Sequence, residues 1–429
     1  MSTRTVAGIF VMLFLPALVP PSMAAPEAVV LRCGRVIDGL SDKPKADLGI
    51  LVRDGRITAI GKDVHGSSAV QEIDLRSATC LPGLIDLHAH LTINPKTLSG
   101  LDLSRSSAAR GLDALRNAQT MLRAGFTTLR CPGESDAFYA VVDVKKAIER
   151  GEHLGPRLLV APHALSATGG HGDLNNLAAD LDAETPTRVV DGPDALRKAI
   201  REELKYGGDW IKLMLTGGVM SAGDDPNVTT FTDEELAAAV EETHRHGKKI
   251  TVHAHGAPGI RASLRAGVDS VEHGSFIDDE AIALFKERGV PLIPTVYVLH
   301  YILESGERMG FPAESIAKAR AIVAERDQRF RKAIAAGVRV AFGSDTIFPH
   351  GDATREFAAL VALGLAPLDA IRAATTNAAE LLGLKESIGS LEAGKIADIV
   401  AVPGNPLEDI RALESVSFVM QGGDVVKRP

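Results

Sequence analysis

Two short histidine motifs each end a run of apolar residues. His88 and His90 follow the run 83–87, and His253 and His255 close the run 249–252. Side chains two residues apart on a strand point to the same face, so each motif can present two imidazoles to one site. Imidazole nitrogen suits divalent zinc, and carboxylate oxygen often completes the shell. The two motifs therefore predict a metal-dependent site.

Three further polar residues stand at comparable positions. Lys212 lies within the apolar run 210–214, His273 follows Glu272, and Asp345 follows Gly-Ser after the run 338–342. Each has an ordinary alternative: a snorkelling lysine, a strand-end histidine that is merely hydrogen-bonded, and a helix N-cap aspartate. Because all of them fall at the same end of different runs, we interpret them as parts of the same site.

The elements that must position these residues alternate between strands and helices. Apolar runs separated by helical stretches occur at residues 83–87, 126–130, 157–161, 210–214, 249–253, 268–272, 290–293 and 338–342. Such alternation predicts an α/β fold with a parallel sheet, and eight strands close a (β/α)8 TIM barrel whose chemistry lies where the strands end. A doubly wound open sheet is the alternative, but no glycine-rich phosphate loop follows an early strand.

Both ends of the chain have short strand-like runs separated by turns. Neither flank has enough strands for a stable sheet alone. We therefore predict a small composite β-sandwich domain of residues 25–81 plus 388–429, with the barrel spanning residues 82–387.

The first 24 residues have the pattern of a cleaved secretory signal peptide: Arg4, an apolar run, then small residues near Ala24. An uncleaved anchor is the alternative, but the run falls short of the ~20 residues that span a bilayer. We expect an exported protein, periplasmic or secreted, with no stable membrane insertion. Whether two of Cys33, Cys80 and Cys131 pair is left open.

Composition excludes several classes of protein. With 429 residues, 45% of them hydrophobic, the chain is no small disulfide-stapled module. Its 47 basic and 55 acidic residues are well mixed and give a net charge of −8, so no nucleic-acid partner is expected.

The motifs together resemble the amidohydrolase superfamily in its two-metal subtype. The run 81–88 (Leu-Pro-Gly-Leu-Ile-Asp-Leu-His), the run 389–398 and the order of the polar residues are typical of its members. The segments 168–172, 212–218 and 350–352 resemble its prolidase-like, imidazolonepropionase-related branch, which includes Xaa-Pro dipeptidases and ochratoxin-type amidohydrolases. The signal peptide and Lys212 argue against an imidazolonepropionase.

The resemblance implies a ligand set for two divalent metal ions, with Zn2+ expected. His88, His90 and Asp345 would hold the first ion, and His253 and His273 the second. Lys212 would be N6-carboxylated and bridge both, since an unmodified ammonium would be repelled by two dications. His255 is the alternative to His253 and stays open.

The resemblance also implies an activity. A hydroxide bridging the two metals would attack the amide bond of a small peptide or N-acyl amino acid with a free carboxylate, with Asp345 as general base and then general acid. His163 or His171 could stabilise the oxyanion, and Tyr297 could bind the oxyanion or a substrate carboxylate. For these three, a solvated loop histidine or simple packing are the alternatives.

The loop 163–191 is expected to form part of the pocket wall, with a lid as the weaker reading, and the segment 299–312 is a second candidate wall. A lactonase or phosphotriesterase using the same site is the enzymatic alternative. A non-catalytic metal-binding barrel is disfavoured, because Lys212, Asp345 and all four histidines are present. Relatives of this kind commonly assemble, so a homo-oligomer is expected.

Overall fold

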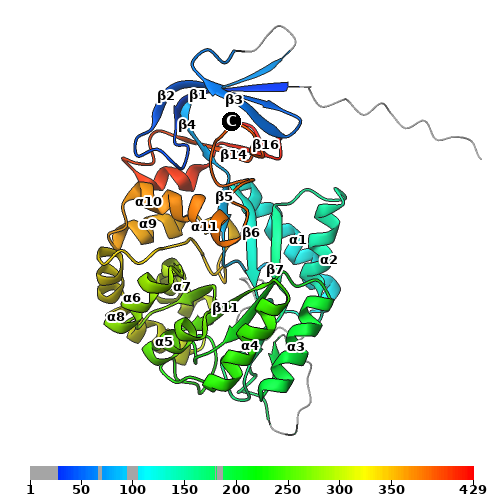
Figure 1. Cartoon of the computed structure of the whole chain (residues 1–429), viewed down its shortest axis with the longest axis vertical. Helices are drawn as coiled ribbons and strands as arrows, with labels where there is room; N and C mark the ends of the chain where they lie inside the picture. The colour runs from blue at the N-terminus through cyan, green and yellow to red at the C-terminus, as the bar shows by residue number, and fades with distance from the viewer. Residues whose placement is uncertain (1–27, 66–69, 94–104, 179, 181–186) are drawn as a thin grey trace, which may run out of the picture.

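The computed structural model describes residues 28–65, 70–93, 105–178, 180 and 187–429. It has two parts: a small β-domain at one end, and a larger α/β part whose helices α3 and α4 lie at the other end (Figure 1). The predicted signal peptide, residues 1–24, lies outside the described residues.

The small domain is one mixed sheet of seven strands in the order β16-β15-β14-β4-β1-β2-β3. Strands from both flanks of the chain thus share one sheet, because β14 pairs with β4 in antiparallel register. The strands are β1 (Ala28–Val36), β2 (Lys45–Arg53), β3 (Arg56–Gly61), β4 (Gln71–Pro82), β14 (Ile399–Pro403), β15 (Phe418–Gln421) and β16 (Asp424–Lys427).

The predicted β-sandwich is wrong in detail, since the domain has one continuous sheet and not two stacked ones. Backbone hydrogen bonds join β3 and the turn before it to the segment that precedes β14. They run from Ile57 N to Lys395 O (2.9 Å) and from Ala397 N to Gly55 O (2.9 Å). The sheet therefore curls around its own apolar core, which includes the fully buried side chains of Leu31 and Phe418.

A disulfide joins Cys33 on β1 to Cys80 on β4, and Cys131 is a buried free thiol. This settles the pairing that the sequence left open.

The larger part alternates strands and helices, as predicted. Its strands are β5 (Leu84–Asp86), β6 (Phe126–Pro132), β7 (Arg157–Ala161), β8 (Ala164–Ser166), β9 (Arg188–Val189), β10 (Trp210–Met214), β11 (Lys249–Ala254), β12 (Ser270–His273) and β13 (Leu292–Ile293). The pairings within these ladders are parallel, in two sheets ordered β5-β6-β7 and β13-β12-β11-β10-β8-β9.

The eighth predicted strand, 338–342, is reduced to one isolated parallel bridge between Val340 and Leu292 and to single backbone hydrogen bonds. Its Ala341 N donates to Leu292 O (2.9 Å), and its Phe342 O accepts from Leu87 N (3.0 Å). The segment thus contacts β13 on one side and the chain after β5 on the other, although the two ladders do not form one continuous closed sheet.

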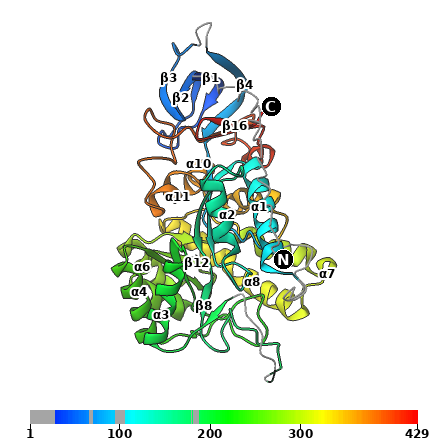
Figure 2. The ribbon, with the colours of Figure 1, turned by 90° about the vertical axis from the view of Figure 1, so that its right-hand side faces the viewer.

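Helices lie on both sides of these ladders in the two views (Figures 1 and 2). They are α1 (Ser107–Arg123), α2 (Ala140–Glu149), α3 (Pro193–Lys205), α4 (Asp233–Arg245), α5 (Ala257–Ala266), α6 (Asp279–Arg288), α7 (Val296–Met309), α8 (Ala313–Ala335), α9 (Arg355–Ala362), α10 (Pro367–Ala373) and α11 (Thr376–Leu381). Short 3-10 turns occur at His350–Asp352 and Ile410–Ser415.

Local sequence explains several helix ends. Thr232 and Glu235 form a reciprocal capping box at the start of α4, which satisfies donors that would otherwise lack partners. Gly267 and Gly289 end α5 and α6 in the left-handed conformation that glycine adopts without strain. None of the described helices combines the length and apolarity that crossing a bilayer requires.

Candidate metal centre

The residues predicted to bind metal come together at one cavity of about 370 Å³. They come from five separate segments that follow or lie in β5, β10, β11, β12 and the 338–342 backbone. The cavity is lined by His88, His90, Lys212, His253, His255, His273 and Asp345, among others. Parallel strands end at a common edge, and this explains why residues so far apart in sequence meet there.

His88, His90 and Asp345 form one half of the centre. The Nε2 atoms of His88 and His90 lie 3.6 and 3.1 Å from Asp345 Oδ1. His88 Nδ1 lies 2.7 Å from Glu272 Oε2, and His90 Nδ1 lies 2.6 Å from Gly133 O. A carboxylate and a carbonyl only accept hydrogen bonds, so both Nδ1 atoms carry protons and both Nε2 atoms point toward Asp345.

This half of the centre fits a cation. Burial lowers the pKa of His88 to about 4, so its imidazole is neutral at pH 7 and able to bind a metal. Burial opposes protonation of His90 too, but its hydrogen bond to Asp345 raises its pKa above the usual value. Asp345 thus stabilises positive charge beside His90, as it would stabilise a metal ion in the same place.

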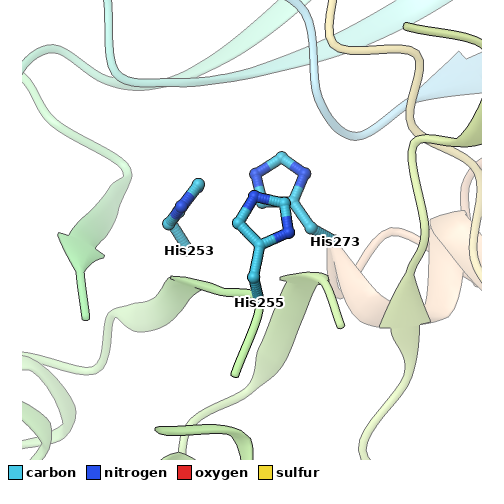
Figure 3. Close-up of side chains that lie close together, drawn as sticks. All are labelled: His253, His255 and His273. Atoms are coloured by element: carbon cyan, nitrogen blue, oxygen red, sulfur yellow. The ribbon is translucent and has the colours of Figure 1, made fainter. Parts of the chain in front are cut away.

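His253, His255 and His273 form the other half (Figure 3). One ligand atom from each lies within 4.8 Å of the others, and His273 also forms such a group with His88 and Asp345. The His255 and His273 rings stack 4.9 Å apart, and His253 meets His273 edge-on at 4.4 Å. Both His253 and His255 thus remain able to bind a metal with His273.

The electrostatics of this half favour neutral imidazoles. Burial, followed by neighbouring cationic groups, lowers the pKa of His253 and His273 well below the usual value. Burial also lowers the pKa of His255 to about 3. Three neutral imidazoles in one place are a nitrogen donor set of the kind that zinc binds.

The backbone is strained at two of the residues that line the cavity. His273 has a φ of 68° and Asp345 a φ of 57°, and both residues lack the freedom of glycine in that region. Thr295, whose Oγ1 lies 2.7 Å from His273 Nδ1, has a φ of 44°. Strain of this kind persists where surrounding structure holds it and is common at active sites.

Lys212 is a fully buried lysine on β10 that lines the cavity. Burial lowers its pKa to about 8, with Arg130 adding to the effect and Glu272 and Asp345 opposing it. The neutral amine is therefore populated at a lower pH than in an exposed lysine.

The three residues predicted to contact the substrate differ in their position relative to the cavity. His171 lines the cavity, with its ring stacked on that of His253 at 4.3 Å. Its Nδ1 lies 2.6 Å from Ser221 Oγ, which in turn donates to Asp224 (2.6 Å). A side chain at Gly218 would overlap this ring, so the glycine is needed there.

His163 and Tyr297 do not line the cavity, and their predicted substrate contacts do not fit their positions. His163 is buried behind it, with Nδ1 3.0 Å from Glu203 Oε1 and no partner for Nε2 among the described residues. The Tyr297 hydroxyl accepts from Arg355 (3.1 Å), and its ring packs edge-on against Phe348. Tyr297 therefore packs as its alternative described, whereas His163 is buried and is not the solvated loop histidine of its alternative.

Sequence reasoning missed two features of the cavity. One is Glu272, which the Glu-His-Gly motif of β12 contains but whose contact with His88 is visible only in three dimensions. The other is the contribution of Val298, Val219 and Ile347, which join Leu299 and Ile302 of the predicted segment 299–312 in an apolar wall. The two predicted walls, 163–191 and 299–312, both contribute lining residues.

Comparison with known proteins decides the family. The sequence profile of the Amidohydrolase family matches residues 79–426. The chain belongs to the amidohydrolase family. That match spans the whole α/β part with the residues that converge on the cavity, and it includes β14, β15 and all but the last residue of β16 in the small domain.

Several named proteins are similar to this amidohydrolase in sequence or structure. Ochratoxinase of Aspergillus niger is 32% identical over 96% of this chain and 89% of its own length. A crystal structure of a Xaa-Pro dipeptidase with methionine bound in its active site has a TM-score of 0.87 at 35% identity, covering 93% of this chain and 99% of that one. Imidazolonepropionase of Symbiobacterium thermophilum is 26% identical over 82% of each chain.

Proposed function

We propose that this amidohydrolase cleaves the amide bond of small peptides or N-acyl amino acids that carry a free carboxylate, with two divalent metal ions in its cavity. The observation that carries the proposal is the convergence of His88, His90 and Asp345 with a second group of three histidines on one cavity. Relatives named as a Xaa-Pro dipeptidase and an ochratoxinase support an amide substrate.

The chain's own residues suggest how the reaction is organised. Two divalent ions there would lower the pKa of water and polarise an amide carbonyl. His88, His90 and Asp345 would hold one, and His273 with His253 or His255 the other. Asp345 would accept the proton of the attacking water on a carboxylate oxygen and pass it to the departing amine nitrogen.

Lys212 is proposed to react with CO2 before it takes part. Its neutral amine would form an N–C bond, and the proton released would go to solvent, leaving an N6-carboxylated lysine. The buried position and the pKa of about 8 support this step, because only the neutral amine reacts. The carboxylate product would bridge the two halves of the centre, as an ammonium could not.

The apolar wall suggests which amides fit. Val298 and Leu299, together with Ile302 about one turn further along α7, line the cavity. Burying an aliphatic or aromatic group there is favourable by about 25 cal/mol per Å² of apolar area. We therefore propose that the substrate has at least one bulky apolar group, as an N-aroyl-phenylalanine amide does.

Two further proposals concern the whole protein. We infer that both strand ladders belong to one (β/α)8 barrel, since the 338–342 backbone bonds to both β13 and the chain after β5. We also propose that the protein is exported, and the Cys33–Cys80 disulfide supports this because such bonds persist in oxidising compartments. Fractionation of the native host with a mass spectrum of the mature N-terminus tests export.

The activity is tested by a substrate panel on purified, zinc-loaded protein. The panel contains dipeptides, N-acyl amino acids, a lactone and a phosphotriester, each with and without prior removal of metal by a chelator. Metal-dependent release of an amino acid from an amide substrate is the expected result. Turnover restricted to the lactone or the phosphotriester, or amide turnover that survives complete chelation, would overturn the proposal.

A further inference from the structure

Behind the imidazole ring of His88 lies the carboxylate of Glu272. Its Oε2 accepts from His88 Nδ1 at 2.7 Å, and both side chains are essentially excluded from solvent, at 0% and 2% exposure. Because the carboxylate fixes the His88 proton on Nδ1, the Nε2 lone pair is held toward Asp345. Glu272 thus sets both the tautomer and the ring orientation of a metal-binding histidine.

Glu272 is itself held rigidly. Its Oε1 accepts from Arg130 Nη2 (2.5 Å) and from Thr251 Oγ1. Arg130 also donates from Nε to Leu87 O (2.6 Å), and its guanidinium lies 4.6 Å from the centre of the Trp210 ring. Arg130 is fully buried beside it, so the carboxylate cannot rotate away from His88 without losing these bonds.

Apart from Asp345, which lies 3.1 Å from His90 Nε2 and 4.0 Å from His273 Nδ1, the other imidazoles of the centre have neutral partners. Within the described chain, their other contacts are to a backbone carbonyl or a hydroxyl: His90 to Gly133 O, His253 to Gly217 O, His255 to Ser275 Oγ and His273 to Thr295 Oγ1. A carboxylate behind an imidazole raises its basicity more than a carbonyl or hydroxyl does. The two halves of the centre are therefore electrostatically unequal.

We propose that the half containing His88 binds its metal ion more tightly than the half containing His273 and His253 or His255, and that Glu272 is the positioning residue responsible. This rests on the proposed function, which places two ions in the cavity. It adds an order of loading: the His88 half fills first as the metal concentration rises. Removing a carboxylate of this kind typically weakens metal binding 10–100-fold.

Glu203 supplies a matched control. It is buried to the same degree as Glu272, lies 3.0 Å from an imidazole Nδ1 (His163) and also contacts an arginine, Arg188. It does not line the cavity, and neither does His163. Glu203→Gln therefore repeats the chemical change of Glu272→Gln away from the centre.

The experiment titrates full-length, metal-stripped protein with Zn2+ against a chromophoric chelator. The wild type is expected to show two dissociation constants, and Glu272→Gln to weaken the tighter one about 10–100-fold while the other changes little. Glu203→Gln is expected to leave both unchanged. With one equivalent of 113Cd2+, the wild type should give one NMR resonance and Glu272→Gln two.

A second variant covers the case in which Glu272→Gln does not fold. Thr251→Val removes one hydrogen bond from Glu272 and keeps the side-chain shape, so it should weaken the tighter site by a smaller factor, about 2–5-fold. Circular dichroism monitors folding in each case.

The outcomes separate this inference from the proposed function. Two equal dissociation constants in the wild type, or unaltered constants in both Glu272→Gln and Thr251→Val, would overturn the inference and leave a metal-dependent hydrolase. Absence of specific metal binding in the wild type would overturn the proposed function as well. Equal weakening by Glu203→Gln would show that the effect arises from general destabilisation and would also overturn the inference.

Discussion

Two buried histidine–glutamate pairs have nearly the same chemistry and different surroundings. His88 Nδ1 lies 2.7 Å from Glu272, and His163 Nδ1 lies 3.0 Å from Glu203. All four side chains are at most 2% exposed. An arginine contacts each glutamate. Residue type, pairing and burial therefore do not distinguish a histidine that lines the cavity from one that does not.

The surroundings of the remaining ring nitrogen make the difference. His88 Nε2 faces Asp345 in a cavity shared with other imidazoles, whereas His163 Nε2 is buried with no partner among the described residues. His163 also packs edge-on against Tyr139 at 4.8 Å. A site requires that the free nitrogen meet other donors in a space that a ligand can occupy, and only the first pair meets that condition.

The largest expected effect tests this comparison directly. His88→Asn should lower kcat/KM about a thousandfold, since a lost metal contact removes several kcal/mol of transition-state stabilisation. His163→Asn should leave kcat/KM within about threefold and lower the free energy of unfolding by about 1–3 kcal/mol, because it weakens a buried hydrogen bond. Steady-state kinetics and urea unfolding of both variants provide the measurement, and equal losses of activity would refute the distinction.

A second test concerns a lysine whose burial sets its reactivity. Because burial lowers the pKa of Lys212 to about 8, its neutral fraction in the metal-free enzyme should rise about tenfold from pH 7 to pH 9. Carboxylation of Lys212 should rise with it, as measured by 13C NMR with labelled bicarbonate.

The same lysine is also expected to make the free energy of unfolding depend on pH. A folded pKa below the usual 10.5 means that the unfolded chain binds the extra proton between pH 8 and 10.5, so this group makes stability rise with pH there. Lys212→Arg should lose both the carbon signal and this pH dependence. A signal that persists in Lys212→Arg would assign the carboxylation to another residue.

A third test compares two isoleucines of one apolar cluster. Ile302 lines the cavity, and Ile316 packs in the same cluster away from it. Both Ile→Ala changes should lower the free energy of unfolding by about 2–4 kcal/mol. Only Ile302→Ala should lower the preference for an N-acyl-phenylalanine over an N-acyl-alanine, by about tenfold. The ratio of kcat/KM values for the two substrates checks this, and equal preferences in the two variants would show that α7 does not select the substrate.

The smallest effect on activity is expected from removing the disulfide of the small domain. Replacing both Cys33 and Cys80 by serine should lower the free energy of unfolding by about 2–4 kcal/mol while kcat/KM stays within about twofold. The disulfide links β1 and β4, and neither cysteine lines the cavity. Thermal unfolding and kinetics under oxidising conditions measure both quantities, and a large loss of activity without unfolding would connect the small domain to catalysis.

Much of the α/β part was predictable from local patterns. Four of the predicted runs coincide closely with β6, β7, β10 and β11, because apolar runs between amphipathic helices have one stable arrangement. The weak eighth strand and the additional strands β8 and β9 were not predictable, since their pairing depends on the curvature of the whole structure. The single curled sheet of the small domain depends on contacts between the two flanks for the same reason.

The sequence alone determined which side chains could bind a metal. A two-residue spacing on a strand fixes the face of His88 and His90, and parallel strands fix the edge at which Lys212, His273 and Asp345 emerge. Only the tertiary structure decided what lies behind and beside each of them. Hydrogen bonds to Glu272 and packing onto α7 join segments distant in sequence, and no local periodicity records such contacts.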